Sequence, residues 1–177
     1  MTVNHRTGPE NDRLERWMRE HGQAVRGYLR ALVRREDEAE ELAQEVFHRA
    51  WRARQSYREN GTARAYLLRI ADRLACDQAR KKRPEVNLDT TAWKYVEPCA
   101  DSGQPEARIG QSETNRQLHA ALDQLTADQR RVLLMRYYTQ MTFTEIADVM
   151  QCPLNTALSH CRRGLFALRT ILAEHRP

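Results

Sequence analysis

The chain has 177 residues, which is enough for one medium-sized domain or two small ones. It carries 29 Lys and Arg residues against 24 Asp and Glu residues, and the formal net charge of +5 permits nucleic-acid binding without establishing it. No apolar run is long enough to span a bilayer, and the N-terminus lacks the hydrophobic segment of a secretion signal. We therefore expect a cytoplasmic protein with no membrane insertion.

The four cysteines of the chain include no C-x-x-C pair: Cys76, Cys99, Cys152 and Cys161. In a cytoplasmic protein such cysteines are expected to be reduced thiols. A zinc site made by Cys152, His160 and Cys161 is disfavoured, because their spacing fits no common zinc-binding motif. The sequence therefore predicts no metal ion and no cofactor.

Residues 11–83 are predicted to form one small domain of three amphipathic helices. Residues 1–10 are polar and contain a glycine and a proline, as is typical of a loose tail. Apolar residues recur at three- and four-residue steps from residue 14 to residue 32, which predicts the first helix.

A second helix is expected from about residue 38 to residue 54, with Asp37 as its N-cap. Six acidic residues and no basic residue lie between Glu36 and Glu45. One interpretation is structural, because the positive end of the helix dipole favours acids in the first turns. The other is functional: outward acids such as Glu41 and Glu45 could meet a basic partner surface.

The third helix, predicted for residues 65–83, is strongly basic and ends before Pro84. The preceding segment, residues 55–62, has the composition of a loop. At about 100° per residue, three arginines of the helix share one face, away from its apolar side: Arg69, Arg73 and Arg80. This face suits either plain solvation or binding to a polyanion.

Residues 84–112 contain prolines and glycines, are acidic and show no helical period, so they are predicted to be a flexible linker. The helical period then returns and defines a second domain, residues 113–174. Thr142 and Glu145 have the capping-box spacing at the start of a short helix. After a break at residues 151–153, a last helix is expected to about residue 173. Helix, tight turn and helix predict a helix-turn-helix.

The last helix is predicted to have an inward apolar face and an outward polar face. The inward residues are Ala157, Cys161, Gly164, Leu168 and Leu172. The outward residues are Asn155, Ser159, Arg162 and Arg163. Small hydrogen-bonding residues near the N-terminus of a helix, followed by arginines, suit base and phosphate contacts in a major groove, although an ordinary helical hairpin has the same pattern. The predicted fold class is all-α: two small helical domains and a linker.

Two segments together resemble the extracytoplasmic-function, or group 4, sigma factors of the sigma-70 family. The first segment resembles the family's D-x-A-E-D-L-x-Q-E-x-F helix at Asp37, Ala39, Glu40, Leu42, Gln44, Glu45 and Phe47, with Glu41 replacing Asp. It also resembles W-L-x-x-I-A-x-N-x-x-x-D-x-x-R at Leu67, Ile70, Ala71, Asp77 and Arg80. Tyr66 replaces the Trp of that pattern and Arg73 replaces the Asn.

The second segment is similar to the family's helix-turn-helix pattern. Its matches are Leu125, Arg130, Glu145, Ile146, Ala147, Pro153, Thr156, Ser159 and Arg163. Leu158 occupies a position where the family often has a basic residue, and Gly164 replaces Ala. The resemblance covers about residues 14–172, and the departures bear on promoter sequence.

The resemblance implies a non-catalytic subunit that binds core RNA polymerase, recognises the −35 and −10 promoter elements and promotes DNA melting, with an anti-sigma factor as a further possible partner. The region 2-like domain would bind core polymerase through Asp37, Glu40, Glu41, Gln44, Glu45 and Phe47. It would bind the −10 element through Tyr57, Arg58, Asn60, Tyr66, Arg69, Arg73, Asp77, Arg80 and Lys81. The region 4-like domain would bind the −35 element through Asn155, Thr156, Leu158, Ser159, Arg162 and Arg163.

Two other classes of protein compete with this interpretation. A helix-turn-helix regulator without a polymerase role explains the C-terminal half, but it leaves the acidic motif and the basic helix as coincidences. An enzyme is disfavoured, because the sequence shows no nucleophile–base pattern, no phosphate-binding glycine loop and no metal-ligand spacing.

Overall fold

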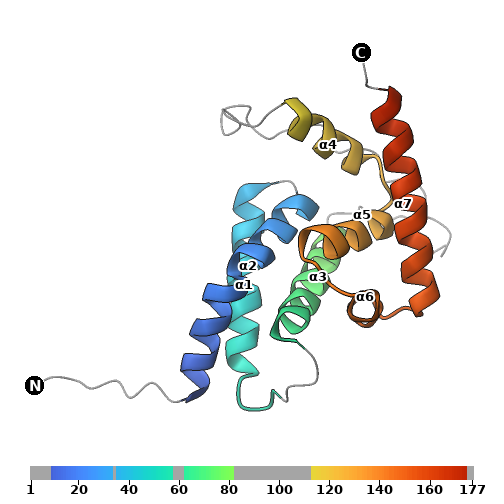
Figure 1. Ribbon diagram of the computed structural model, residues 1–177. Helices are drawn as coiled ribbons and strands as arrows, with labels where there is room; N and C mark the ends of the chain where they lie inside the picture. The colour runs from blue at the N-terminus through green and yellow to red at the C-terminus, as the bar shows by residue number, and fades with distance from the viewer. Residues whose placement is uncertain (1–8, 34, 58–61, 82–112, 175–177) are drawn as a thin grey trace, which may run out of the picture. The chain divides into compact units, whose positions relative to one another are not determined.

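The computed structural model describes residues 9–33, 35–57, 62–81 and 113–174 (Figure 1). Every regular element in these ranges is helical. The chain divides into two compact units, Met1–Lys82 and Arg83–Pro177. The predicted all-α class with two helical domains is thus confirmed. The predicted linker, residues 84–112, lies outside the described residues.

Three helices form the first unit: α1 (Pro9–Val33), α2 (Glu36–Arg52) and α3 (Ala63–Lys81). Each of the three packs on the other two, and they run from blue to green in Figure 1. The apolar stripes predicted from the sequence meet at the centre, where the side chains are almost completely buried: Val25, Leu29, Val46, Leu67, Leu68 and Ala71. Burial of these stripes, rather than helix propensity, is the main source of stability for such a small unit.

The prediction that Asp37 is the N-cap of α2 is wrong. The helix begins at Glu36, and the residue in the N-cap position, Arg35, makes no side-chain capping bond. Asp37 lies in the first turn, where its carboxylate accepts hydrogen bonds from the Arg35 guanidinium at 3.2 and 2.5 Å. This contact holds the pKa of Asp37 below its ordinary value. The positive end of the helix dipole is stabilised by the three acids of the first turn, so the helix begins at Glu36, before the expected cap.

The second unit contains α4 (Glu113–Asp123), α5 (Ala127–Leu133), the π-helical turn η3 (Leu134–Tyr138), α6 (Phe143–Met150) and α7 (Leu154–Glu174). The long helix α7 packs on α4, α5 and α6. These elements run from yellow to red in Figure 1. The centre of the unit consists of fully buried side chains from α5, η3, α6, α7 and the connection before α6: Val132, Met135, Met141, Ile146 and Ala157.

The start and end of α6 follow from local chemistry. The Thr142 hydroxyl accepts from the Glu145 backbone N–H at 3.2 Å, and the Glu145 carboxylate accepts from the Thr142 backbone N–H at 2.8 Å, so the predicted capping box is present. The helix ends at Met150, and the next residue, Gln151, takes a left-handed backbone conformation with φ of 53°. The chain then reverses into α7, which completes the helix-turn-helix.

The helical segment from Ala127 to Tyr138 is not one regular α-helix. After Leu133 it widens into η3, and the Thr139 N–H bonds to the Leu134 carbonyl five residues earlier at 3.1 Å. The buried Thr139 hydroxyl donates to the Met135 carbonyl at 2.7 Å. This bond satisfies a polar group inside the core at the point where the helix ends.

Candidate functional site

The outward side of α2 is an acidic surface, which we define as Asp37, Glu40, Glu41, Gln44 and Glu45. Glu41 and Gln44 are exposed, and the side chains of Asp37 and Glu45 are 60 % and 41 % exposed. Glu40 pairs with Arg26 of α1 across 3.3 Å, which ties one edge of the acidic surface to the neighbouring helix. The acidic surface thus brings five of the six predicted polymerase-binding residues together.

The sixth of these residues, Phe47, is not part of the acidic surface. Its side chain is 6 % exposed and belongs to the core of the first unit. The motif therefore combines outward polar residues with an inward ring that holds α2 against its neighbours. Phe47 therefore affects the acidic surface only by holding α2 in position.

Glu45 is held as a carboxylate by its neighbours one turn along α2. It accepts a hydrogen bond from Arg49 at 2.7 Å and lies 3.5 Å from His48. The Arg49 bond, with a smaller contribution from His48, holds the pKa of Glu45 below its ordinary value. The acidic surface therefore keeps this negative charge through the neutral pH range.

The predicted basic face of α3 is present in the second half of the helix. Arg73, Arg80 and Lys81 are exposed, whereas Arg69 is half-buried. Arg80 pairs with Asp77 one turn earlier, so the two predicted −10 residues contact each other. The exposed side chains of Arg73, Arg80 and Lys81 form a cationic strip along α3, which suits a phosphate backbone.

At the N-terminal end of α3, three aromatic rings form a cluster, which we call the aromatic cluster: Trp17, Tyr57 and Tyr66. The centroids of Tyr57 and Tyr66 are 4.5 Å apart with planes at 54°, and Trp17 meets Tyr57 edge-on at 4.9 Å. Tyr57 and Tyr66 are half-buried, and burial raises the pKa of the Tyr66 phenol. Two predicted −10 residues are thereby brought together, while Arg58 and Asn60 lie outside the described residues.

Sequence reasoning did not assign a site role to Trp17 or to Arg13. Trp17 lies within the apolar stripe that predicts the first helix, between residues 14 and 32. Arg13 precedes Trp17 by four residues, the spacing that places two side chains on one helix face, and its guanidinium lies 5.4 Å from the ring centroids of both Trp17 and Tyr57. This i, i+4 spacing of a cation and an aromatic residue is the signal that could have revealed the pair.

Asp72 is a second polar residue that sequence reasoning missed. It is 2 % exposed and accepts a hydrogen bond at 2.8 Å from the hydroxyl of Tyr28, which is fully buried in α1. Asp72 directly precedes Arg73, so the buried bond to α1 and the exposed cationic strip lie on adjacent residues of α3. The bond fixes the rotation of α3 at the point where it offers its arginines to solvent.

The N-terminal half of α7 has the two faces that the sequence predicts. The predicted inward residues Ala157, Cys161 and Gly164 are buried, and Leu168 and Leu172 are half-buried. Outside, the polar residues are exposed, together with Leu158 at 40 %: Asn155, Ser159, Arg162 and Arg163. Thr156 is half-buried in the first turn. The predicted −35 residues are therefore collected on the first three turns of α7.

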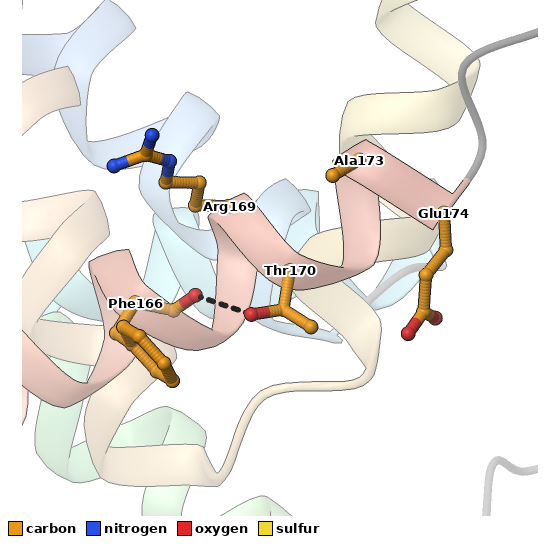
Figure 2. Close-up of a pocket in the computed structure, with 5 residues that line it drawn as sticks. All are labelled: Phe166, Arg169, Thr170, Ala173 and Glu174. Atoms are coloured by element: carbon orange, nitrogen blue, oxygen red, sulfur yellow. Dashed lines mark hydrogen bonds between the residues drawn. The ribbon is translucent and has the colours of Figure 1, made fainter.

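Further along α7 lies a shallow hollow lined by Phe166, Arg169, Thr170, Ala173 and Glu174 (Figure 2). The Phe166 ring is 75 % exposed, and the Thr170 hydroxyl donates to the Phe166 carbonyl at 3.2 Å. The hollow carries no nucleophile–base pair. In the described part of the chain, no three His, Cys, Asp or Glu side chains converge as metal ligands. Burial raises the pKa of the Cys161 thiol, which keeps it in the neutral form.

Two helical units, one with a cationic strip and one with a helix-turn-helix, define a DNA-binding regulator of transcription. Residues 17–85 match the family model for sigma-70 region 2, and residues 115–168 match that for sigma-70 region 4. Among the curated relatives, the ECF RNA polymerase sigma factor SigW of Bacillus subtilis is 30 % identical over 143 residues, which cover 77 % of this chain and 76 % of that protein. The RNA polymerase sigma-H factor of Pseudomonas aeruginosa is 30 % identical over 151 residues, 81 % of this chain and 78 % of that protein. The chain belongs to the ECF sigma factors of the sigma-70 family.

Two solved structures share the fold. The sigma factor RpoE of Bartonella quintana, in complex with the anti-sigma factor NepR, matches with a TM-score of 0.70 and 20 % identity, covering 93 % of this chain and 99 % of that chain. CnrH, in complex with the cytosolic domain of CnrY, matches with a TM-score of 0.71 and 20 % identity, covering 94 % and 92 %. No helix in the described ranges of this chain is long and apolar enough to cross a membrane.

Proposed function

We propose that this chain binds core RNA polymerase as a non-catalytic sigma subunit in the cytoplasm, and directs it to promoters that carry a −35 and a −10 element. The observation that supports this role best is the presence of separate surfaces of opposite charge within the first unit. The acidic surface of α2 suits a basic protein partner, and the cationic strip of α3 suits DNA. A regulator that only binds duplex DNA needs no acidic surface of this kind.

We assign core-polymerase binding to the acidic surface, with Phe47 holding α2 in place. Glu41 is exposed, and Glu40 pairs with Arg26 of α1. Contacts with Arg35 and Arg49 hold the pKa values of Asp37 and Glu45 below their ordinary values. Exposed charges on a binding surface contribute mainly to the rate and the specificity of association. This surface would meet a basic helical surface of the polymerase.

We assign capture of the −10 element to residues 11–83, and in particular to the aromatic cluster and the cationic strip. Opening a promoter requires bases to leave the stack and to be held as a single strand. Aromatic rings supply stacking and arginines supply phosphate contacts, the two interactions that hold single-stranded DNA. Tyr57 and Tyr66 would stack on bases, and Arg73, Arg80 and Lys81 would follow the backbone; Arg58, Asn60, Arg69 and Asp77 complete the assignment.

We assign the −35 element to residues 113–174. The exposed side chains at the start of α7 are of the types that recognition helices use for base edges and phosphates in a major groove. Leu158 would replace a charged contact with an apolar one to a thymine methyl group. Residues 84–112 would join the two domains and thread toward the polymerase active site.

An anti-sigma factor is a further partner that we propose for this chain. Of the solved structures that share the fold, one is the sigma factor RpoE in complex with the anti-sigma factor NepR, and the other is CnrH in complex with the cytosolic domain of CnrY. An inhibitor of this chain would have to cover one or more of the acidic surface, the −10 residues and the −35 residues, because these are the surfaces through which the chain would act.

Reconstitution with core polymerase tests the proposed function. The template carries a promoter that lies near the gene encoding this protein. We expect a run-off transcript when core polymerase and this protein are both present, and none with either alone. Footprinting of the same promoter by the protein without polymerase is the control. A strong specific footprint without polymerase, and no added transcript with it, would favour the helix-turn-helix regulator instead.

A further inference from the structure

The turn after α2 is tied to α1 by a side chain that neither motif of the family resemblance includes. The Arg13 guanidinium donates a hydrogen bond to the Arg54 carbonyl at 2.7 Å, across 41 residues of sequence. The same guanidinium lies against the rings of Trp17 and Tyr57, at 5.4 Å from each centroid. One side chain of α1 thus contacts both the backbone of the turn and the aromatic residue that ends it.

The backbone of this turn delivers Tyr57 to a defined place. The Ala53 carbonyl accepts hydrogen bonds from the N–H groups of Ser56 and Tyr57 at 3.1 and 2.9 Å. The Arg13 bond holds the turn from outside, and the Trp17 and Tyr66 rings hold the Tyr57 side chain. Tyr57 is therefore fixed by contacts from α1 and α3 as well as by its own turn.

The charge of Arg13 is already engaged in these contacts. Arg13 is half-buried, its guanidinium has a carbonyl partner, and it lies beside two rings. Leaving this position to bind a phosphate would require the loss of those contacts. Arg16, three residues further along α1, is exposed and carries the same charge, so it serves as a matched control.

We propose that Arg13, together with Trp17, is a positioning residue for −10 capture: it fixes the Tyr57 ring in the orientation in which a flipped base stacks on it. This inference rests on the proposed function, because it concerns the same strand-opening step. Preorganisation of this kind lowers the ordering cost of binding rather than adding a contact to DNA. Arg13 therefore acts through Tyr57, and its loss should change base stacking without changing the number of phosphates neutralised.

The test compares holoenzymes carrying wild type, Arg13→Met, Arg13→Lys and Arg16→Met. Methionine keeps much of the aliphatic packing on Trp17 but has no donor, whereas lysine keeps a donor for the Arg54 carbonyl. Open complexes are measured by permanganate reactivity, and stacking by the fluorescence of 2-aminopurine placed at the non-template −10 base. Binding of a single-stranded −10 oligonucleotide at several salt concentrations measures the phosphate contacts.

We expect Arg13→Met to reduce open complexes about five- to tenfold, with weaker quenching of 2-aminopurine and an unchanged salt slope. Arg13→Lys should stay within about threefold of wild type, because a donor remains, and Arg16→Met should match wild type. Circular dichroism and core-polymerase affinity should be the same for all four proteins.

Three outcomes would overturn the inference. The first is an Arg13→Met holoenzyme that opens the promoter and quenches 2-aminopurine as well as wild type does. The second is a loss accompanied by a salt slope that falls by about one, which would make Arg13 a direct phosphate contact. The third is an equal loss in Arg16→Met. A wild-type holoenzyme that does not open the promoter would instead overturn the proposed function, and the inference with it.

Discussion

The hydroxyl of Tyr28 in α1 donates a hydrogen bond to the carboxylate of Asp72 in α3, at 2.8 Å. Tyr28 is fully buried and Asp72 is 2 % exposed. A carboxylate inside a helical core is costly unless hydrogen bonds satisfy it, so this contact decides how α1 and α3 can pack. It also couples the core to the cationic strip, because Arg73 follows Asp72 directly in the chain.

Removing the hydroxyl should therefore destabilise the first unit. We expect Tyr28→Phe to lower the free energy of unfolding by about 1–3 kcal/mol, since it leaves a buried acceptor short of a donor. Urea denaturation followed by circular dichroism measures the change. The double variant with Asp72→Ala should lose less than the sum of the two single variants, because each substitution removes the same bond. Additive losses would contradict a direct coupling between the two side chains.

Gly164 permits the close approach of α7 to α5. A Cβ atom at this position would lie 3.1 Å from Leu133 Cδ1 and 3.2 Å from Gln129 Cβ. Alanine would favour the helix by about 1 kcal/mol, but crowding in a packed core costs about 1–3 kcal/mol. We expect Gly164→Ala to destabilise the second unit by about 1 kcal/mol in a urea titration. Stabilisation would show that Leu133 moves aside at little cost.

The proposed role of the acidic surface predicts that reversing its charge lowers the affinity for core polymerase. We expect the double variant Glu41→Lys and Glu45→Lys to weaken association about tenfold, because each substitution reverses a charge that faces the partner. Affinity can be measured by surface plasmon resonance on immobilised core enzyme. The control is Glu15→Lys, which reverses an exposed acid of α1 outside the acidic surface. Equal affinities for the double variant and wild type, with unchanged helical content, would refute this assignment.

Variants of the two proposed DNA-binding surfaces should lose transcription for different reasons. Arg162→Ala should weaken recruitment to a duplex promoter and remove sensitivity to −35 sequence, with a loss of about 1–3 kcal/mol for a base contact. Arg73→Ala should leave recruitment largely in place but reduce permanganate-reactive thymine around the start site. A template melted in advance should restore transcription by the Arg73 variant and not by the Arg162 variant. Rescue of both variants, or of neither, would contradict the division of roles between the two domains.

Much of the fold follows from periodicity in the sequence. The stripes of α1, α2 and α3 predict the buried faces, and the capping-box spacing of Thr142 and Glu145 predicts the start of α6. The widening at η3 could not be predicted in this way, because it depends on the buried Thr139 and its bond to Met135. Local propensity does not encode a contact whose value comes from burial.

The candidate site was predictable to a smaller extent. Helical spacing predicts which residues of a helix are exposed, such as those on the outward side of α7. Contacts between distant segments do not: the bond from Arg13 to the Arg54 carbonyl and the pair of Tyr28 and Asp72 join residues 41 and 44 positions apart. Periodicity shows which face of a helix is buried, but not which residues meet there.

The inward position of Phe47 has a consequence for genetic screens. If the acidic surface binds core polymerase as we propose, we expect a search for variants that fail to transcribe to return substitutions at both Phe47 and Glu41. The cause differs: truncating a buried ring lowers the fraction of folded protein and so its cellular abundance, whereas changing an exposed acid leaves abundance as it was. Immunoblots alongside reporter activity would separate the two groups, and the steady-state level of the protein is the quantity that distinguishes a residue of the scaffold from a residue of the contact.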